Sequence, residues 1–339
     1  MARLMLEAAP SFFWLAALTL GHAGARQPTG LTVTSAASQG WPAISDDRIV
    51  WVDYRRGNRD IYLYDLRSGK ETPLTTNSAS QEWPAISGDR IVWEDYRHGN
   101  WEIYLCDLAA GREVRITNDP YRQFLPAISA ERIVWVDYRS GNADIWLHDL
   151  RTGQQAPITT NPASQDWPAL SGDRVVWVDY RNGNPDIYLY DLRTRREVPI
   201  TTDGAAQLWP AISGDKIVWV DYRKGNGDIY LYDLRAGKEV SIATNAASCG
   251  RPAVYGELVV WEDNRNGNAD IYMYDLATGR ESRITSDPND QLFPAVSRNH
   301  IVWYDYRSAK GDIYVHDLRK GTEARITSSS GAYSKNGDR

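Results

Sequence analysis

Residues 167–194 read WPALSGDRVVWVDYRNGNPDIYLYDLRT. The stretch holds three short runs of strand-forming residues, WPALS, RVVWVD and DIYLYDL, which are separated by the turn-forming residues GD and RNGNP. The 3.6-residue spacing of apolar side chains that marks an amphipathic helix is absent from it. The stretch therefore predicts consecutive antiparallel strands joined by tight turns.

The same pattern returns every 42 residues without an insertion, and a fourth extended segment, such as TPLTT at 72–76, completes each repeat. The W-P-A tripeptide or its variant begins at Trp41, Trp83, Leu125, Trp167, Trp209, Arg251 and Phe293. Four strands in about 40 residues are typical of a propeller blade. We predict an all-β chain with one seven-bladed β-propeller of four-stranded antiparallel blades over residues 41–327, each blade starting at one of these positions.

A second tryptophan keeps the same step through all seven repeats, at Trp51, Trp93, Trp135, Trp177, Trp219, Trp261 and Trp303. The runs around it are apolar on both faces, as strands squeezed between neighbouring blades must be. Burial of one indole removes about 200 Å² from water, a gross gain of roughly 5 kcal/mol. We therefore expect these tryptophans to form the core.

The turn in the middle of each repeat carries two acids and an arginine, as in DYRRGN followed by Asp60. We expect a structural hairpin turn in which Arg55 bridges the carboxylates of Asp53 and Asp60. A calcium loop built from Asp53, Asn58 and Asp60 is the alternative. Its spacing does not match the known D-x-[DN]-x-[DN]-G pattern, and Arg55 competes for the same carboxylates.

Residues 167–194 resemble the repeat of TolB-like propellers and of the propeller repeats in prokaryotic cell-surface proteins, and DYRNGNPDIY is similar to their Ser-Asp-Arg-x-Gly-Asn-x-x-Ile-Tyr signature. The resemblance covers residues 41–327. It implies a propeller with an extracytoplasmic binding or scaffolding role and no common catalytic residue. The chain departs from TolB, which has six blades and a separate N-terminal α/β domain.

The two ends of the chain lie outside the repeats. Residues 1–25 have a basic start, a short apolar run and the small residues AGA, which predict a cleaved signal peptide and export to the periplasm, the cell surface or the medium. An uncleaved anchor is the weaker alternative, because the apolar run is too short to span a bilayer. Residues 26–40 are expected to clasp the last blade, where 31–34 and 323–327 compete for the outer strand. Residues 328–339 read as a polar tail.

The totals restrict the partners. A net charge of −6 gives no basic face for nucleic acid or anionic lipid, and we expect no membrane span in the mature chain. Cys106 and Cys249 fall at different points of the repeat, so a disulfide between them is not expected. The five histidines are scattered, and we predict no metal and no other cofactor. We expect a monomer with an unknown protein or glycan ligand.

Departures from the repeat indicate where a site can lie. The sixth unit differs most, with Cys249 for glutamine, Arg251 before the proline, Tyr255 for serine and Asn264 for tyrosine. A ligand site there and neutral drift of one blade remain open alternatives. Aromatic side chains before the prolines suit stacking on a ligand, or they wedge between blades; they are Trp41, Trp83, Trp167, Trp209 and Phe293.

From these observations we predict an exported, non-catalytic propeller that binds or scaffolds a protein or glycan, with no catalytic residue. The alternative is a polysaccharide-active hydrolase or lyase that uses carboxylates near the central opening. A third interpretation is cell-surface assembly through the blade edges. The sequence contains no G-x-S-x-G elbow, which argues against a serine hydrolase site of its own.

Overall fold

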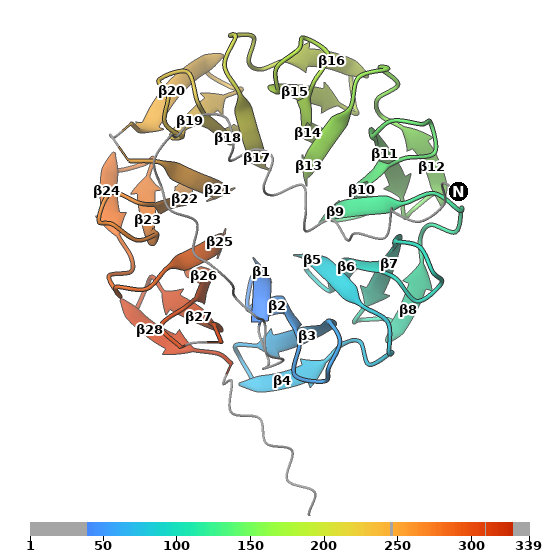
Figure 1. Cartoon of the computed structure of the whole chain (residues 1–339), viewed down its shortest axis with the longest axis horizontal. Helices are drawn as coiled ribbons and strands as arrows, with labels where there is room; N and C mark the ends of the chain where they lie inside the picture. Colours follow the sequence, from blue (N-terminus) through green and yellow to red (C-terminus); the bar gives the residue numbers. More distant parts are fainter. Residues whose placement is uncertain (1–38, 245–246, 309, 328–339) are drawn as a thin grey trace, which may run out of the picture. The chain divides into compact units, whose positions relative to one another are not determined.

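The computed structural model of the protein describes residues 39–244, 247–308 and 310–327. These residues form seven four-stranded antiparallel sheets set around a common centre, and no helix occurs among them (Figure 1). The predicted all-β, seven-bladed propeller is thus confirmed. Each sheet consists of four strands that are consecutive in sequence, so we number the blades 1 to 7 along the chain.

The strands recur in four types from the centre outward. The inner strands are β1 (Gln39–Ser45), β5 (Gln81–Ser87), β9 (Gln123–Ser129), β13 (Gln165–Ser171), β17 (Gln207–Ser213), β21 (Cys249–Tyr255) and β25 (Gln291–Ser297). The second strands are β2 (Arg48–Asp53), β6 (Arg90–Asp95), β10 (Arg132–Asp137), β14 (Arg174–Asp179), β18 (Lys216–Asp221), β22 (Leu258–Asp263) and β26 (His300–Asp305).

The two remaining types complete each sheet. The third strands are β3 (Asp60–Asp65), β7 (Glu102–Asp107), β11 (Asp144–Asp149), β15 (Asp186–Asp191), β19 (Asp228–Asp233), β23 (Asp270–Asp275) and β27 (Asp312–Asp317). The outer strands are β4 (Lys70–Pro73), β8 (Arg112–Arg115), β12 (Gln154–Pro157), β16 (Arg196–Pro199), β20 (Lys238–Ala243), β24 (Arg280–Arg283) and β28 (Thr322–Arg325). We call the face that carries the turns between second and third strands the upper face, and the opposite one the lower face.

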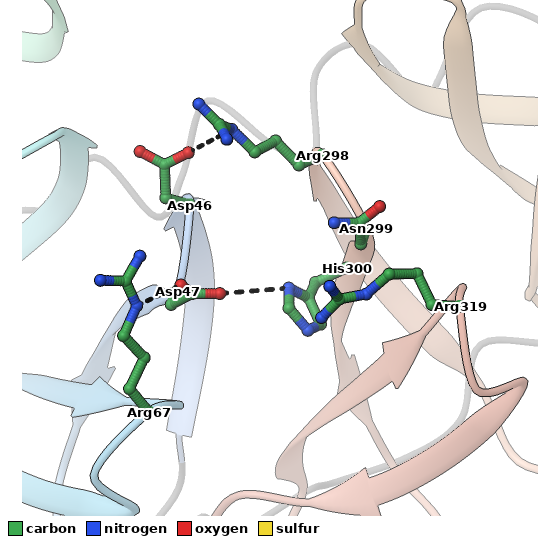
Figure 2. A pocket seen from close by; sticks show the side chains of 7 residues that line it. All are labelled: Asp46, Asp47, Arg67, Arg298, Asn299, His300 and Arg319. Atoms are coloured by element: carbon green, nitrogen blue, oxygen red, sulfur yellow. Dashed lines mark hydrogen bonds and ion pairs between the residues drawn. The ribbon is translucent and has the colours of Figure 1, made fainter.

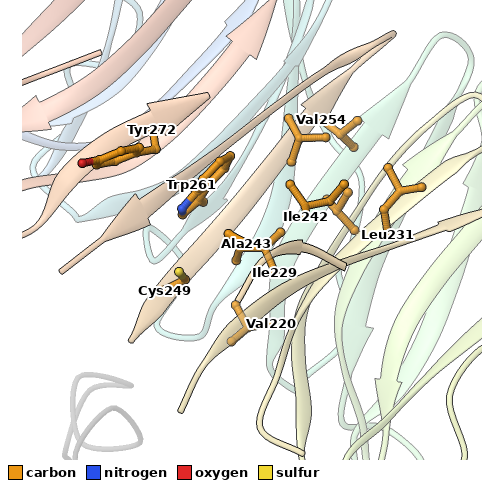
Figure 3. Packing of buried hydrophobic residues seen from close by; sticks show 11 residues of the cluster. Val220, Ile229, Leu231, Ile242, Ala243, Cys249, Val254, Trp261 and Tyr272 are labelled. Atoms are coloured by element: carbon orange, nitrogen blue, oxygen red, sulfur yellow. The ribbon is translucent and has the colours of Figure 1, made fainter. Parts of the chain in front are cut away.

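The core lies between neighbouring blades, where apolar side chains of second and third strands meet the next sheet. Trp261 of blade 6, fully buried, packs with Val220, Ile229 and Leu231 of blade 5 (Figure 3). All seven tryptophans of this type are 0 % exposed. They are the largest fully buried side chains, as their invariance in the repeat predicted.

Each core tryptophan is held by the turn on the upper face. In blade 4, Trp177 Nε1 donates a 2.9 Å hydrogen bond to Asp179, and its ring stacks on Tyr188 with centroids 6.0 Å apart. The guanidinium of Arg181 lies over the same Tyr188 ring at 4.3 Å. Arg181 also pairs with Asp179 at 2.6 Å and with Glu197 of the outer strand at 2.6 Å.

The turn is therefore structural, but the predicted arginine bridge between its two acids is wrong. In blade 1, Arg55 links Asp53 to Glu71 of β4 rather than to Asp60. The second acid instead accepts a hydrogen bond from Asn58, which also donates to the backbone of the following loop. The outer strand supplies the third charged group. The residues of the turn alone therefore do not predict this ion pair.

Ring closure does not use a shared strand within the described residues. The outer strand of blade 7 is β28, and blade 1 has its own outer strand, β4. Blade 1 packs on blade 7 through Trp51 and Val302, among others, and Asp46 N donates a 2.9 Å hydrogen bond to Ser297 Oγ. The predicted signal peptide, the clasp up to residue 38 and the tail lie outside the described residues.

Candidate functional site

The inner strands bring one residue per blade toward the central axis. Each inner strand has a bulge at its W-P-A tripeptide, because the proline cannot donate a hydrogen bond to the second strand. The residue before the proline has a left-handed backbone in every blade, with φ between 39° and 56°. We call these seven residues the axial belt: Trp41, Trp83, Leu125, Trp167, Trp209, Arg251 and Phe293.

The left-handed backbone makes the belt a strained feature. A non-glycine residue in this conformation costs on the order of 1 kcal/mol or more, and glycine would avoid that strain. The sequence nevertheless places a large side chain at this position in all seven blades. Every blade therefore keeps a strained residue whose side chain is directed toward the axis.

The belt side chains meet one another across the axis. Trp41 lies 5.0 Å from Trp83 and 6.2 Å from Phe293 between ring centroids. Trp83 of blade 2 makes an edge contact at 5.7 Å with Trp167 of blade 4. Blade 3, between them, contributes the smaller Leu125, which leaves room for this contact.

The belt remains partly open to water and to ligands. All seven residues are half-buried. The buried indole nitrogen of Trp41 has no hydrogen-bond acceptor among the described residues. Next to Trp41 on the side of blade 7, the ring of Phe293 is stacked by the Arg251 guanidinium at 3.8 Å. The belt therefore offers aromatic surface to a molecule on the axis.

Three acids, two of them buried and one half-buried, lie beside the belt in blades 2 and 4. Glu94 of β6 accepts a 2.6 Å hydrogen bond from the backbone of Leu125, while its second oxygen is buried without a partner among the described residues. Glu82 of β5 pairs with Arg59 of blade 1. Asp166 of β13 accepts a 2.8 Å hydrogen bond from the backbone of Trp167. We call Glu82, Glu94 and Asp166 the acid cluster.

Burial makes the acid cluster hard to ionise. It raises the pKa of Glu94 well above its usual range, and the negative charges of Glu82 and Asp166 raise it further. Burial also raises the pKa of Asp166 to about 6, against the opposing hydrogen bond from Trp167. Since Glu94 responds to charges on blade 2 and on blade 4, the three acids share one electrostatic environment on the axis.

Two tyrosines of the upper face complete this environment. Burial raises the pKa of Tyr180 to about 12, with further contributions from Asp166 and Tyr138. Burial raises the pKa of Tyr138 as well, and Asp166 adds to the shift. Both residues are nevertheless exposed at the surface, at 38 % and 39 %. Two exposed phenol groups thus lie within electrostatic range of Asp166.

The acid at the position of Glu94 has one counterpart, and its surroundings differ. Glu262 of β22 accepts a 2.7 Å hydrogen bond from the backbone of Phe293, as Glu94 does from Leu125. Its nearest charged partner is Arg251, at 3.9 Å. Burial raises the pKa of Glu262, and Arg251 opposes the shift. Blade 6 thus pairs this acid with an arginine of the same blade, whereas Glu94 has two other acids in its surroundings and the arginine there, Arg59, is paired with Glu82.

The residues predicted as a site in the sixth unit do not come together. Cys249 is 2 % exposed and lies in the core between blades 5 and 6, with its sulfur 3.5 Å from Asp263 (Figure 3). Asn264 donates to the backbone of Ser248 on the upper face. Tyr255 ends β21 on the lower face, where it hydrogen-bonds to Arg298. Of this set, Arg251 alone belongs to the axial belt.

Sequence reasoning missed the acid cluster because carboxylates were assigned to the seven-fold rings of the turns. A signal was present. At the position of Glu94, four other repeats have valine: Val52, Val136, Val178 and Val220. An acid inside an apolar strand departs from the repeat as clearly as the substitutions of the sixth unit do. A position-by-position comparison of the repeats is enough to identify it.

Among the described residues, no group of three histidine, cysteine or acidic side chains could hold a metal ion. Within the same ranges, no helix has the length and apolar character that a membrane crossing requires.

No protein-family description matches the sequence, and no curated protein matches it either. Solved structures do resemble it. A puromycin-hydrolysing peptidase of Mycobacterium tuberculosis superposes with a TM-score of 0.71 at 12 % identity, over 87 % of this chain and 54 % of that one. The propeller domain of the Trilobed protease of Pyrococcus furiosus gives 0.70 at 15 % identity, over 87 % and 99 %.

TolB of Acinetobacter baumannii also matches, with a TM-score of 0.53 at 18 % identity, over 83 % of this chain and 77 % of TolB. The chain has the fold of the TolB-like propellers, as the repeat predicted. The identities are too low to carry more than the fold. The chain spans about half the length of the peptidases that it resembles.

The prediction of a non-catalytic binding or scaffolding module needs correction. The similar structures are mostly peptidases, among them acylaminoacyl peptidase and puromycin hydrolase, and one is an oligogalacturonate lyase. The repetition of the blades had indicated a purely structural role for the repeated residues. Propellers of this shape recur in enzymes, so the fold does not favour a role apart from catalysis.

Proposed function

We propose that the protein takes part in peptide hydrolysis, and that the axis of its propeller selects substrates by their free amino end. The observation that carries this proposal is the buried, unpartnered oxygen of Glu94 beside Glu82 and Asp166. An ammonium group would supply the missing hydrogen bond and, since Arg59 is already paired with Glu82, a positive charge for the other two acids. The acid cluster is thus suited to a cation.

The axial belt supports the same ligand. Indole rings attract cations through their faces, and they pack well on apolar side chains. A short peptide with an apolar first residue would bring an ammonium group and a side chain to the two kinds of surface at once. Trp83 and Trp167 lie in the blades that hold the acid cluster, so one end of a peptide can engage both.

Peptide hydrolysis as the wider process rests on the similar structures, most of which are peptidases. The sequence contains no G-x-S-x-G elbow, so the proposal concerns the selection of peptides and assigns no serine nucleophile to this chain. The leader-like residues 1–25 support an exported protein that meets its peptides outside the cytoplasm.

Calorimetric titration with a hydrophobic tripeptide, in free and N-acetylated forms, tests the proposal. The free form should bind at least about 10-fold more tightly, because acetylation removes the charge. Glu94→Gln should abolish this preference. Glu262→Gln, the same change at the same repeat position in blade 6, should retain it.

Equal binding of the two forms, or no binding of either, would overturn the proposal. Incubation of the purified chain with the free tripeptide, followed by mass spectrometry, tests separately whether the chain itself breaks the peptide bond. Cleavage that is lost in Glu94→Gln would place the bond-breaking step at the acid cluster.

A further inference from the structure

A second polar site lies on the lower face at the seam where blade 7 meets blade 1. A pocket of about 230 Å³ opens there (Figure 2). Its lining residues come from turns and strand ends of both blades: Asp46, Asp47, Arg67, Arg298, Asn299, His300 and Arg319. Its lining residues lie on the lower face, opposite the turns of the upper face.

The turn residues at this seam depart from the repeat. Arg298 and Asp46 occupy the left-handed position of the turn between inner and second strand, with φ of 45° and 52°. The other five repeats have glycine or alanine there: Gly88, Ala130, Gly172, Gly214 and Gly256. Arg298 and Asp46 form a 2.6 Å ion pair across the seam. Both strained residues thus serve the one junction that joins the last blade to the first.

The next two positions also change. Asn299 stands where all six other repeats have an acid: Asp47, Asp89, Glu131, Asp173, Asp215 and Glu257. His300 stands where five of the other repeats have a basic residue: Arg48, Arg90, Arg132, Arg174 and Lys216. Blade 7 therefore presents a neutral amide and an imidazole where an acid and a cation are usual.

The charges of the lining do not cancel. Asp46 is paired with Arg298, and Asp47 with Arg67 at 2.6 Å. Arg319 lies 3.8 Å from Asp317, which also pairs with Lys320 at 3.1 Å. Three arginines and Lys320 thus face the three carboxylates of Asp46, Asp47 and Asp317, so one positive charge is in excess.

His300 supplies the second observation. Its side chain is only 9 % exposed and lines the pocket (Figure 2). Its Nδ1 lies 3.9 Å from Asp47 and its Nε2 lies 4.0 Å from Asp317, both beyond hydrogen-bond distance. A buried imidazole without a hydrogen bond favours a ligand that accepts one.

We propose that this pocket binds a small oxyanion, a phosphate or a carboxylate, through Arg319, Arg298, the amide of Asn299 and His300. Guanidinium groups match the paired oxygens of such anions. A divalent cation is excluded among the described residues, since they contain no suitable group of three ligands. Because Arg67 of blade 1 faces the same pocket, the bound anion strengthens the closure of the ring.

Thermal unfolding of the full chain with inorganic phosphate, against sodium chloride of equal ionic strength, tests the proposal. Phosphate should raise Tm saturably, by about 2 to 4 °C at ten times Kd. Acetate as a second probe distinguishes the two sources: a shift with acetate alone assigns the pocket to carboxylates, and a shift with phosphate assigns it to phosphate.

Two variants and one control make the test specific. Asn299→Asp restores the acid of the six other repeats, so it should fold normally and lose at least about 10-fold in anion affinity through repulsion. Arg319→Ala should weaken binding similarly. Arg193→Ala, the same repeat position in blade 4, should leave it unchanged. Equal Tm shifts in all variants, or no excess over chloride with either anion, would overturn the proposal.

Discussion

The interfaces between neighbouring blades, which we call the walls, and the axis of the ring differ in how uniform their residues are among the seven repeats. At the walls, the same tryptophan, aspartate and arginine recur in all seven blades and make the same contacts. On the axis, the belt holds four tryptophans, a leucine, an arginine and a phenylalanine, and acids stand beside it in some blades only. Residues that are identical in all repeats are therefore those that stabilise every blade. Difference among repeats marks where the molecule can distinguish one ligand from another.

The largest expected effect contrasts the two kinds of tryptophan. Trp177→Ala should lower the free energy of unfolding by about 3 to 5 kcal/mol, because it empties a fully buried site between blades. Trp83→Ala removes a half-buried side chain and should cost about 1 kcal/mol. Urea unfolding followed by circular dichroism measures both. A loss for Trp83→Ala as large as that for Trp177→Ala would remove the distinction between wall and axis.

The next effect concerns the buried acid of the wall. Asp221 accepts hydrogen bonds from Trp219 and Arg223, which outweigh the effect of burial and lower its pKa. Asp221→Asn should therefore reduce stability by about 2 kcal/mol at neutral pH. A lowered pKa stabilises the fold above the usual range of aspartate, and this contribution is lost as the pH falls through the folded value.

The difference between Asp221→Asn and the natural protein should therefore shrink below about pH 4. Urea unfolding at pH 7 and at pH 3.5 provides the comparison. Asp173→Asn, at an aspartate whose side chain is 49 % exposed, serves as a control and should change stability by no more than about 0.5 kcal/mol. A pH-independent gap for Asp221→Asn would contradict the ionic account of the wall.

The acid of the axis should behave in the opposite way. The pKa of Asp166 is raised to about 6, so its ionised form weakens the fold above that pH. Asp166→Asn should raise stability at pH 7.5 by about 1 to 2 kcal/mol, and the gain should vanish below about pH 4. Urea unfolding over this range measures it. Loss of stability at pH 7.5 would mean that the charge of Asp166 is compensated in the natural protein.

The smallest effect tests the strain in the belt. Leu125→Gly relieves the left-handed backbone of a residue with φ of 51° but removes a side chain from the axis. These contributions oppose each other, and the net change in unfolding free energy should stay within about 1 kcal/mol. Denaturant unfolding gives the value. A loss above about 2 kcal/mol would assign the belt to the wall type of packing.

The sequence alone was enough to predict the walls, because each wall contact is repeated seven times. The 42-residue spacing of the tryptophans from Trp51 to Trp303 predicted the number of blades, and the positions of the turn residues predicted the strands. The partner of Arg55 was misassigned, since Glu71 follows it by 16 residues and reaches it only once the outer strand is folded back. A local sequence pattern does not predict a contact that forms only when separate segments of the chain come together.

The axis was predicted less well for a related reason. The belt positions were recognised as a set, yet Glu82, Glu94 and Asp166 were not, since blades 2 and 4 meet over the small Leu125. Which side chains face each other across a ring depends on the size of the residue between them. The sixth unit drew attention through the number of its substitutions, although Cys249 and Tyr255 point to different environments.

Since every blade is built from one uninterrupted segment, no particular blade has to come first in the chain. Joining the present ends of the ring and cutting the chain before another inner strand would change the order of synthesis but none of the seven walls. The contacts at the axis and at the 7–1 seam distinguish one blade from another.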